Sequence, residues 1–354
     1  MISAPVRVSV FGKTDLGLTR DHNEDTFLVA DLSTGNASLQ PDVRDHEVGP
    51  RGSLFMVADG MGGAAAGEVA SAMAADIIYQ HLATAWATDQ DATAARFAYR
   101  MKEAVELANQ RIYAYAREHP DVRGMGTTVT AAGVFGDTLF LTQIGDSRGY
   151  LVRNGEAFQL TRDQSLTQRL VDAGELTEEE AEQSERRNII LQALGPDPRV
   201  KVDVSRQQLR RGDVLILCSD GLSGVVRREE FAYMASTSPD LPTLCSALID
   251  LANERGGPDN VTVVAARFHG EGLPNADAAE GAGYQVYHVP EQESSESPET
   301  REPPPPPPLP PPPQAPLQSS AEAIAPPLPA GRRNGLVVAV ALVVLVALIL
   351  AAIL

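Results

Sequence analysis

The order of its periodic segments constrains the fold of this chain more than any other feature. Segments with strand periodicity come first, two long segments with helical periodicity follow, and strand periodicity then resumes. This order predicts an α+β fold, an α/β/β/α sandwich of two antiparallel sheets flanked by helices. The strand segments are 6–11, 24–30, 53–59, 127–134, 138–144 and 148–153, and the helical segments are 67–86 and 93–119.

Shorter signals complete this outline. The sequence "RNGE" at 153–156 is typical of a tight β-hairpin turn. Residues 165–195 predict short polar helices, and residues 241–255 predict one more helix before the last strand.

Acidic residues recur where apolar strands end. Three apolar runs deliver Asp59, Asp146 and Asp220, and Asp259 precedes the last strand. A strand end is a rigid place to hold a charged side chain, so we expect one shared site. For Asp146 alone, a structural turn in which its side chain binds backbone amides is the favoured interpretation.

The ligand types at these turns favour particular metals. Carboxylate oxygens, with no histidine beside these four turns, indicate magnesium, manganese or calcium rather than zinc. A cation bound by few carboxylates lowers the pKa of its water, which suits hydrolysis. The stretch "TRDHNED", 19–25, adds Arg20, whose guanidinium fits a phosphate bidentately.

Six motifs in order carry a family resemblance. Together they resemble the metal-dependent Ser/Thr protein phosphatases of the 2C type, over about residues 6–268. The motifs are Arg-x-x-x-Glu-Asp from Arg20, "ADGMGG" at 58–63, "GMGTT" at 124–128, "GDSR" at 145–148, "CSDGL" at 218–222 and "PDNVT" at 258–262.

The resemblance implies a two-metal site. Asp59 would bridge two Mn²⁺ or Mg²⁺ ions, the Gly60 carbonyl would bind the first, and Asp220 and Asp259 would bind the second. A hydroxide bridging the metals would be the nucleophile, so that no phosphoenzyme forms.

The resemblance also implies roles for the "TRDHNED" stretch and for the mobile segment near the site. Glu24 and Asp25 would hold metal-bound waters, and Arg20 would hold the substrate phosphate. Residues 165–195 resemble the flap beside the active site. Gln164 stands where the family often has histidine, and Met61 stands where eukaryotic members often have a histidine that protonates the leaving group.

A third metal is not favoured by this sequence. Bacterial relatives bind it through an aspartate three residues before the second glycine of "GMGTT", which here is Arg123. The third site should therefore be empty or poorly occupied, unless Asp121 or Asp146 supplies the missing carboxylate.

Charge and cysteine content exclude other classes of function. The chain of 354 residues carries a formal net charge of -18, which disfavours nucleic acid as a ligand. Its two cysteines, Cys218 and Cys245, lie in apolar segments and form neither a disulfide framework nor a zinc motif, so we expect a reducing compartment.

The C-terminal region predicts a tether. Residues 1–270 form the expected domain, and residues 271–334 read as an acidic and proline-rich disordered linker. Residues 335–354 contain no charge and would form about 30 Å of transmembrane helix at about 1.5 Å per residue. Arg332 and Arg333 before it place the domain on the cytoplasmic side, and no signal peptide is expected at the N-terminus.

These features lead to one hypothesis and two alternatives. We expect a monomeric phosphatase domain, anchored by a single span in the cell membrane, that hydrolyses phosphoserine and phosphothreonine on proteins and opposes a Ser/Thr kinase there. The alternatives are a non-catalytic scaffold of the same fold that recruits partners, and a phosphatase of one dedicated regulatory protein.

Overall fold

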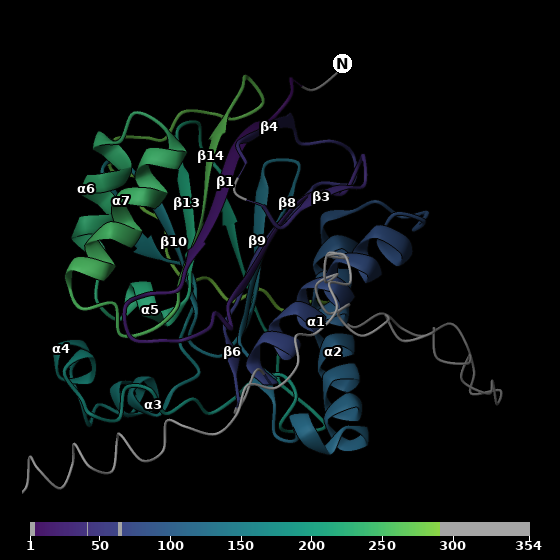
Figure 1. Ribbon diagram of the computed structural model, residues 1–354. Helices are drawn as coiled ribbons and strands as arrows, with labels where there is room; N and C mark the ends of the chain where they lie inside the picture. The colour runs from purple at the N-terminus through teal and green to yellow at the C-terminus, as the bar shows by residue number, and fades with distance from the viewer. Residues whose placement is uncertain (1–3, 41, 63–65, 291–354) are drawn as a thin grey trace, which may run out of the picture. The chain divides into compact units, whose positions relative to one another are not determined.

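The structure is a computed structural model that describes residues 4–40, 42–62 and 66–290 (Figure 1). The chain divides into two compact units, Met1–Glu293 and Ser294–Leu354, and every described residue belongs to the first. The predicted transmembrane helix at 335–354 and most of the predicted linker lie outside the described residues. No helix within the described ranges is long and apolar enough to cross a membrane.

Two antiparallel sheets of six strands form the centre of this unit, as predicted. A third, two-stranded sheet joins the two loops nearest the predicted site. The first sheet has the order β11 (Glu156–Gln159), β10 (Arg148–Arg153), β13 (Val214–Cys218), β14 (Val261–His269), β1 (Arg7–Asp15) and β4 (Arg44–Glu47). The second has the order β12 (Asp203–Gln208), β9 (Thr138–Ile144), β8 (Val129–Phe135), β5 (Ser53–Ala58), β2 (Thr26–Asp31) and β3 (Asn36–Ser38), and the small sheet pairs β6 (Gly60–Met61) with β7 (Gly126–Thr127).

Strand β5 shows why the central strands are apolar at every position. Its six residues are all buried. Phe55 and Val57 face the core between the two sheets. Leu54 and Met56 alternate with them and face the helices on the other side. A strand between two packed layers has no solvent face, so its sequence reads as a continuous apolar run.

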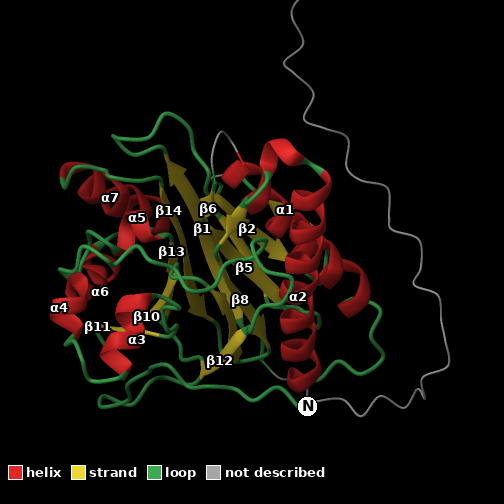
Figure 2. Cartoon of the chain, turned by 90° about the horizontal axis from the view of Figure 1, so that it is seen from below, coloured by secondary structure: helices red, strands yellow, loops and turns green. Residues whose placement is uncertain are grey.

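Helices cover the outer face of each sheet (Figures 1 and 2). Helices α1 and α2 lie on the second sheet with a π-helical turn between them, and α5, α6 and α7 lie on the first. Their bounds are α1 Ala66–His81, the π-turn Leu82–Trp86, α2 Ala94–Glu118, α5 Asp220–Ser223, α6 Arg228–Thr237 and α7 Leu241–Glu254. The predicted α/β/β/α sandwich is therefore confirmed for the described residues.

Local signals set several element ends. The Thr93 side chain caps α2 by accepting a hydrogen bond from the Arg96 N–H, and Asp240 caps α7 in the same way. The predicted flap holds two short helices, α3 (Leu166–Asp172) and α4 (Glu178–Glu182). The hairpin predicted at 153–156 joins β10 to β11.

Both central residues of this hairpin turn have positive φ. The values are 53° for Asn154 and 78° for Gly155. Type I′ turns require this geometry, which asparagine and glycine tolerate best, so the Asn-Gly pair fixes the connection.

The segment after β14 does not leave the domain at residue 270, where the sequence placed the boundary. Residues 271–290, called here the tail segment, contact the loop after β12 and then β12 itself. Arg211 donates its backbone N–H to Pro274 O at 2.8 Å, and Arg210 forms an ion pair with Glu280 at 2.7 Å. Glycine and acidic residues make this stretch resemble a linker, but its backbone is paired with the domain.

Candidate active site

The four predicted aspartates lie on loops that meet at one end of the two sheets. Asp59 follows β5, Asp146 follows β9, and Asp220 opens α5 directly after β13. Asp259 lies two residues before β14. Because Asp59 and Asp146 come from one sheet and the other two from its partner, the sandwich itself assembles the cluster.

Asp59 and Asp220 lie close enough for their carboxyl groups to influence each other's pKa values. Burial raises the pKa of Asp59 well above its ordinary value, and the neighbouring charges of Asp25, Asp220 and Asp146 raise it further. Burial and the Asp259 charge likewise raise the pKa of Asp220.

Asp25 lies beneath these two carboxyl groups. Its Oδ2 accepts a hydrogen bond from the Ser219 hydroxyl at 2.7 Å. Burial raises the pKa of Asp25 to about 7, although hydrogen bonds from Thr262 and Ser219 oppose the shift. The structure therefore brings Asp25 to the cluster, as the family resemblance implies.

Asp146 is buried with an unsatisfied oxygen. Asp146 is only 6% exposed, and its Oδ1 has no hydrogen-bond partner. Burial raises the pKa of Asp146 to about 8, with contributions from the charges of Asp220 and Asp163. An unpartnered buried carboxylate oxygen is costly, so this position favours a bound cation or a proton.

Arg20 contacts a predicted metal ligand. Its Nη2 donates a hydrogen bond to Asp259 Oδ2 at 2.7 Å, and its side chain is half exposed. The hydrogen bond to Asp259 and the charges of Asp259, Glu24 and Asp59 raise the pKa of Arg20. Arg20 thus lies at the rim of the cluster with its guanidinium toward the acidic group.

Gly60 allows a close approach of backbone segments. A Cβ at this position would lie 2.3 Å from Gly67 O and 2.5 Å from Glu24 O. The Gly60 N–H donates to Glu24 O at 3.2 Å, which ties the Asp59 loop to the start of β2. Glu24 presents its side chain nearby, and its buried Oε1 has no hydrogen-bond partner.

Three residues without a predicted role build the supporting network. Asn260 accepts a hydrogen bond from the Glu24 N–H at 2.9 Å and donates to His22 O at 3.1 Å, so it holds the Arg20 loop. Ser219 links Asp25 to β14, and the Thr128 hydroxyl accepts from the Asp59 N–H at 3.1 Å. Each stands beside or within a motif, which was the only sequence signal for it.

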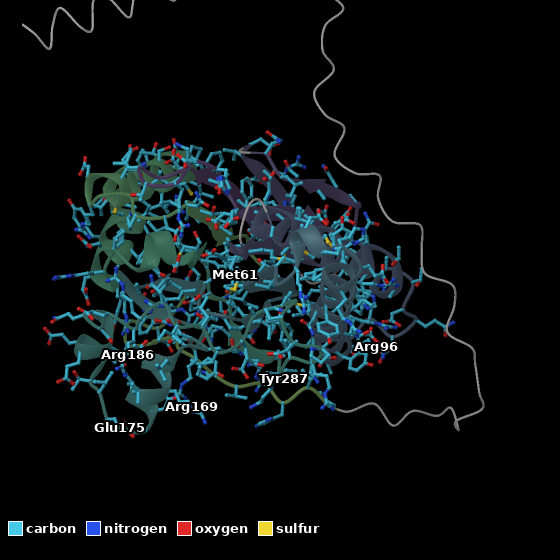
Figure 3. The ribbon with its side chains drawn as sticks, turned by 60° about the horizontal axis from the view of Figure 1, so that its bottom comes forward. Met61, Arg96, Arg169, Glu175, Arg186 and Tyr287 are labelled. Atoms are coloured by element: carbon cyan, nitrogen blue, oxygen red, sulfur yellow. The ribbon has the colours of Figure 1, made fainter. Side chains whose placement is uncertain are left out.

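Three other predicted positions have different surroundings. Asp121 is exposed in the 3-10 turn Pro120–Val122, and the carboxyl groups that shift the pKa of Asp59 do not include it. Arg123 follows this turn and is also exposed. Met61 pairs with Gly126 across the small sheet. Figure 3 labels Met61 together with the flap residues Arg169, Glu175 and Arg186.

The residues fit divalent cations by their chemistry. In the part of the chain that the structure describes, no three His, Cys, Asp or Glu side chains stand in a ready-made metal arrangement. The donors are hard oxygens, two of them are buried without a partner, and their mutual repulsion would be relieved by positive charge.

Comparisons with known proteins identify a family for this chain. The sequence model described as protein phosphatase 2C matches residues 35–251, a range that contains Asp59, Asp146 and Asp220 but not Arg20 or Asp259. The serine/threonine phosphatase stp of Listeria monocytogenes is 37% identical over 253 residues, which is 71% of this chain and 92% of that protein.

Mycobacterial proteins are similarly related. The serine/threonine protein phosphatase PstP of Mycobacterium tuberculosis is 39% identical over 254 residues, 72% of this chain and 44% of that protein. A crystal structure of the catalytic domain of PstP in complex with two manganese ions superimposes with a TM-score of 0.60 at 35% identity, covering 75% of this chain and 99% of that one.

Proposed function

The chain belongs to the protein phosphatase 2C family of Ser/Thr protein phosphatases, and we propose that it hydrolyses phosphoserine and phosphothreonine with two manganese or magnesium ions held at the acidic cluster. The observation that supports this most strongly is the buried cluster itself. Burial raises the pKa values of Asp25, Asp59, Asp146 and Asp220, and the Asp220 charge raises those of the other three further. Glu24 and Asp146 each have a buried oxygen without a hydrogen-bond partner.

The proposed ligands are Asp59, the Gly60 carbonyl, Asp220 and Asp259. Bound there, the cations would lower the pKa of water and so supply a nucleophile near neutral pH. Asp59 and Asp220 would bind the cations as carboxylates, because positive charge compensates the burial and the neighbouring negative charges that raise their pKa values. Glu24 and Asp25 would orient waters from the floor of the site, with Asp25 fixed by Ser219.

Arg20 would bind the substrate phosphate. Its hydrogen bond to Asp259 places a half-exposed guanidinium at the rim, where an incoming phosphate dianion can accept a bidentate pair. Once Asp259 binds a cation, its charge no longer competes as strongly for Arg20. The residue therefore serves substrate binding rather than metal binding.

Anchoring and partners are part of the proposal. Residues 335–354 would form the single membrane span and hold the domain at the cytoplasmic face. Phosphoproteins at that membrane would be the substrates, including the products of a Ser/Thr kinase there. The kinase link rests on fold-level analogy alone. A single dedicated phosphoprotein substrate is the alternative within the same chemistry.

The carboxylates can be tested by neutral replacement. Asp59→Asn and Asp220→Asn should each lower the manganese-stimulated turnover of a phosphothreonine peptide by about 100-fold or more, because each removes charge from the cation site. Asp137→Asn, at an exposed position on the β8–β9 turn, is the matched control and should keep full activity. Equal rates with manganese and with chelator would refute the metal mechanism, and manganese titration by calorimetry would report binding without activity.

A further inference from the structure

The tail strand, residues 285–287, covers the free edge of the second sheet. Strand β12 is the last in that sheet, with β9 on its other side. Arg206 donates its backbone N–H to Gln285 O at 3.0 Å, and Tyr287 donates its N–H to Val204 O at 2.7 Å. This is antiparallel pairing, so the tail strand extends the sheet by one short strand.

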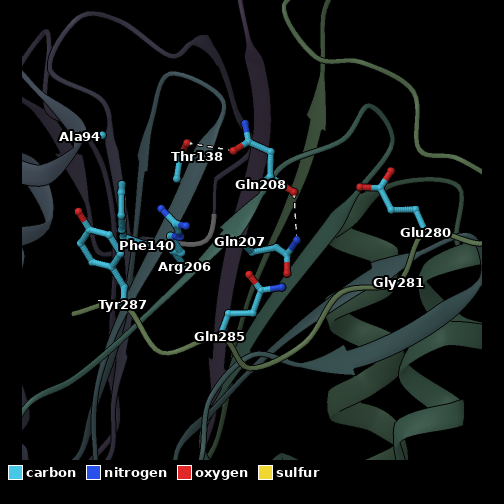
Figure 4. A pocket seen from close by; sticks show the side chains of 10 residues that line it. All are labelled: Ala94, Thr138, Phe140, Arg206, Gln207, Gln208, Glu280, Gly281, Gln285 and Tyr287. Atoms are coloured by element: carbon cyan, nitrogen blue, oxygen red, sulfur yellow. Dashed lines mark hydrogen bonds between the residues drawn. The ribbon is translucent and has the colours of Figure 1, made fainter. Parts of the chain in front are cut away.

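Side chains hold the tail strand at one end only. The Tyr287 ring packs against Phe140 with ring centroids 5.3 Å apart, and the Arg206 guanidinium lies 5.4 Å from the Tyr287 centroid. Between Gly281 and Gln285 one hydrogen bond joins the tail segment to β12, from the Gly283 N–H to Gln207 Oε1 at 3.4 Å. A pocket of about 400 Å³ lies beside it, lined by residues of both segments (Figure 4). The tail strand is therefore docked by a few contacts beside a gap, which makes it separable from the sheet.

A chain of hydrogen bonds leads from β12 to the acidic cluster. Asp203, the first residue of β12, accepts a hydrogen bond from Gln164 Nε2 at 3.2 Å. Gln164 Oε1 accepts one from the Gly145 N–H at 3.0 Å, and the Gln164 N–H donates to Gly145 O at 2.9 Å. Gly145 directly precedes Asp146. The tail strand lies at the same end of β12, because the Tyr287 N–H donates to the carbonyl of Val204, the residue after Asp203.

Gln164 is therefore the middle of this connection. It stands where the family often has a histidine, and its amide supplies a donor for Asp203 and an acceptor for Gly145 at once. A neutral imidazole has one donor and one acceptor on opposite sides of a rigid ring, whereas the longer amide side chain can reach both partners.

We propose that the tail strand is a positioning element of the phosphatase site: by holding the start of β12, it lets Asp203 and Gln164 fix the turn that carries Asp146. The proposal rests on the proposed function only in taking this cluster as the catalytic site. It does not require Asp146 to bind metal. Release of the tail strand from β12 loosens the turn that carries Asp146 and lowers turnover. The tail segment therefore influences the activity of the site.

The experiment compares two proline substitutions in the full-length chain in detergent. Tyr287→Pro removes the N–H that bonds to Val204 O, while His288→Pro places proline one position further, where the alternation of an extended strand points the N–H away from β12. We expect Tyr287→Pro to lower kcat on a phosphothreonine peptide by about 3- to 10-fold, the size of effect seen for residues that act through others. The KM should stay within about twofold.

Amide hydrogen exchange supplies the readout that does not depend on activity. In Tyr287→Pro the peptide containing Gly145 should exchange faster, because its N–H loses a fixed acceptor. His288→Pro should match the unmodified chain in kcat and in exchange. Unchanged exchange at Gly145 together with unchanged kcat in Tyr287→Pro would overturn the proposal.

A second variant tests the route. Gln164→Met keeps the side-chain length and removes the side-chain hydrogen bonds, including those with Asp203 and Gly145. It should therefore lower kcat and speed exchange at Gly145 by itself. Adding Tyr287→Pro should then cost little more, because the connection is already broken. Losses that multiply would overturn the route through Gln164. An unmodified chain without manganese-dependent activity would refute the proposed function instead, and the exchange at Gly145 would still decide this proposal.

Discussion

The ion pair between Arg153 and Asp213 allows a quantitative prediction about stability. Both side chains are only 1% exposed, so solvent does not screen their charges. Arg153 binds Asp213 with two nitrogens, Nε at 2.9 Å and Nη2 at 2.7 Å, and the Arg210 N–H donates to the same carboxylate at 2.8 Å. Asp213→Asn removes the negative charge and places an amide NH₂ group opposite the Arg153 guanidinium or the Arg210 N–H, which are themselves donors.

The expected cost follows from the burial of the pair. Breaking a buried ion pair on one side costs about 3–5 kcal/mol. The buried Arg153 would keep only the more distant Glu280 carboxylate, at 3.5 Å. For a domain of this size the entropy of unfolding is about 0.6 kcal/mol per kelvin, so the melting temperature should fall by about 5–8 °C. Thermal unfolding followed by circular dichroism measures this shift.

A matched control separates burial from charge. Arg7 and Asp45 also form an ion pair, at 2.9 Å, but both side chains are nearly half exposed. Asp45→Asn should cost less than about 1 kcal/mol. If Asp213→Asn cost no more than Asp45→Asn, burial would not be what makes the Arg153 pair important, and the reasoning would fail.

Three further predictions concern pH, substrate and membrane. Burial raises the pKa of Glu103, but hydrogen bonds from His81 and Arg100 outweigh it and bring the pKa from 4.5 to about 2. A carboxyl group with a lowered pKa in the folded state stabilises the fold above pH 4.5, and this contribution is lost as the pH falls towards about 2. Glu103→Gln should therefore lower the free energy of unfolding by about 1–3 kcal/mol at pH 7 and by much less at pH 3, as measured by urea unfolding. Arg20→Ala should raise KM for a phosphopeptide by about 10- to 100-fold without weakening manganese binding measured by calorimetry; loss of the metal would assign Arg20 a different role. Deletion of residues 331–354 should release the chain from membranes at unchanged specific activity, and persistent association in fractionation would point to another anchor.

The sequence predicted which carboxylates gather at the strand ends, but it did not predict the contacts that loop residues make with them. Asp59 and Asp220 were expected to meet because the apolar pattern fixes where β5 and β13 end. The pairing of Arg20 with Asp259 depends on the path of a loop, which periodicity does not describe. Asn260 was missed for the same reason, since its hydrogen bonds join loops far apart in sequence.

Strand β12 and the tail strand were missed for a different physical reason. The β12 sequence, Asp203–Gln208, contains one aliphatic residue, and an edge strand is stabilised largely by backbone hydrogen bonds that any side chain permits. The tail segment looks like a linker because backbone pairing leaves no mark on composition.

The position of the domain boundary follows from this pairing. A fragment that ended at residue 270 would lose the Gly281 carbonyl that accepts from Arg153 Nη1 at 3.0 Å. It would also lose the Glu280 partner of Arg210 and the Gln285 carbonyl on the edge of β12. The buried Arg153 would keep Asp213 but lose one of its acceptors, and the sheet would regain a free edge. The catalytic domain therefore includes the tail segment, and a fragment that ends at residue 290 should be more stable than one that ends at 270.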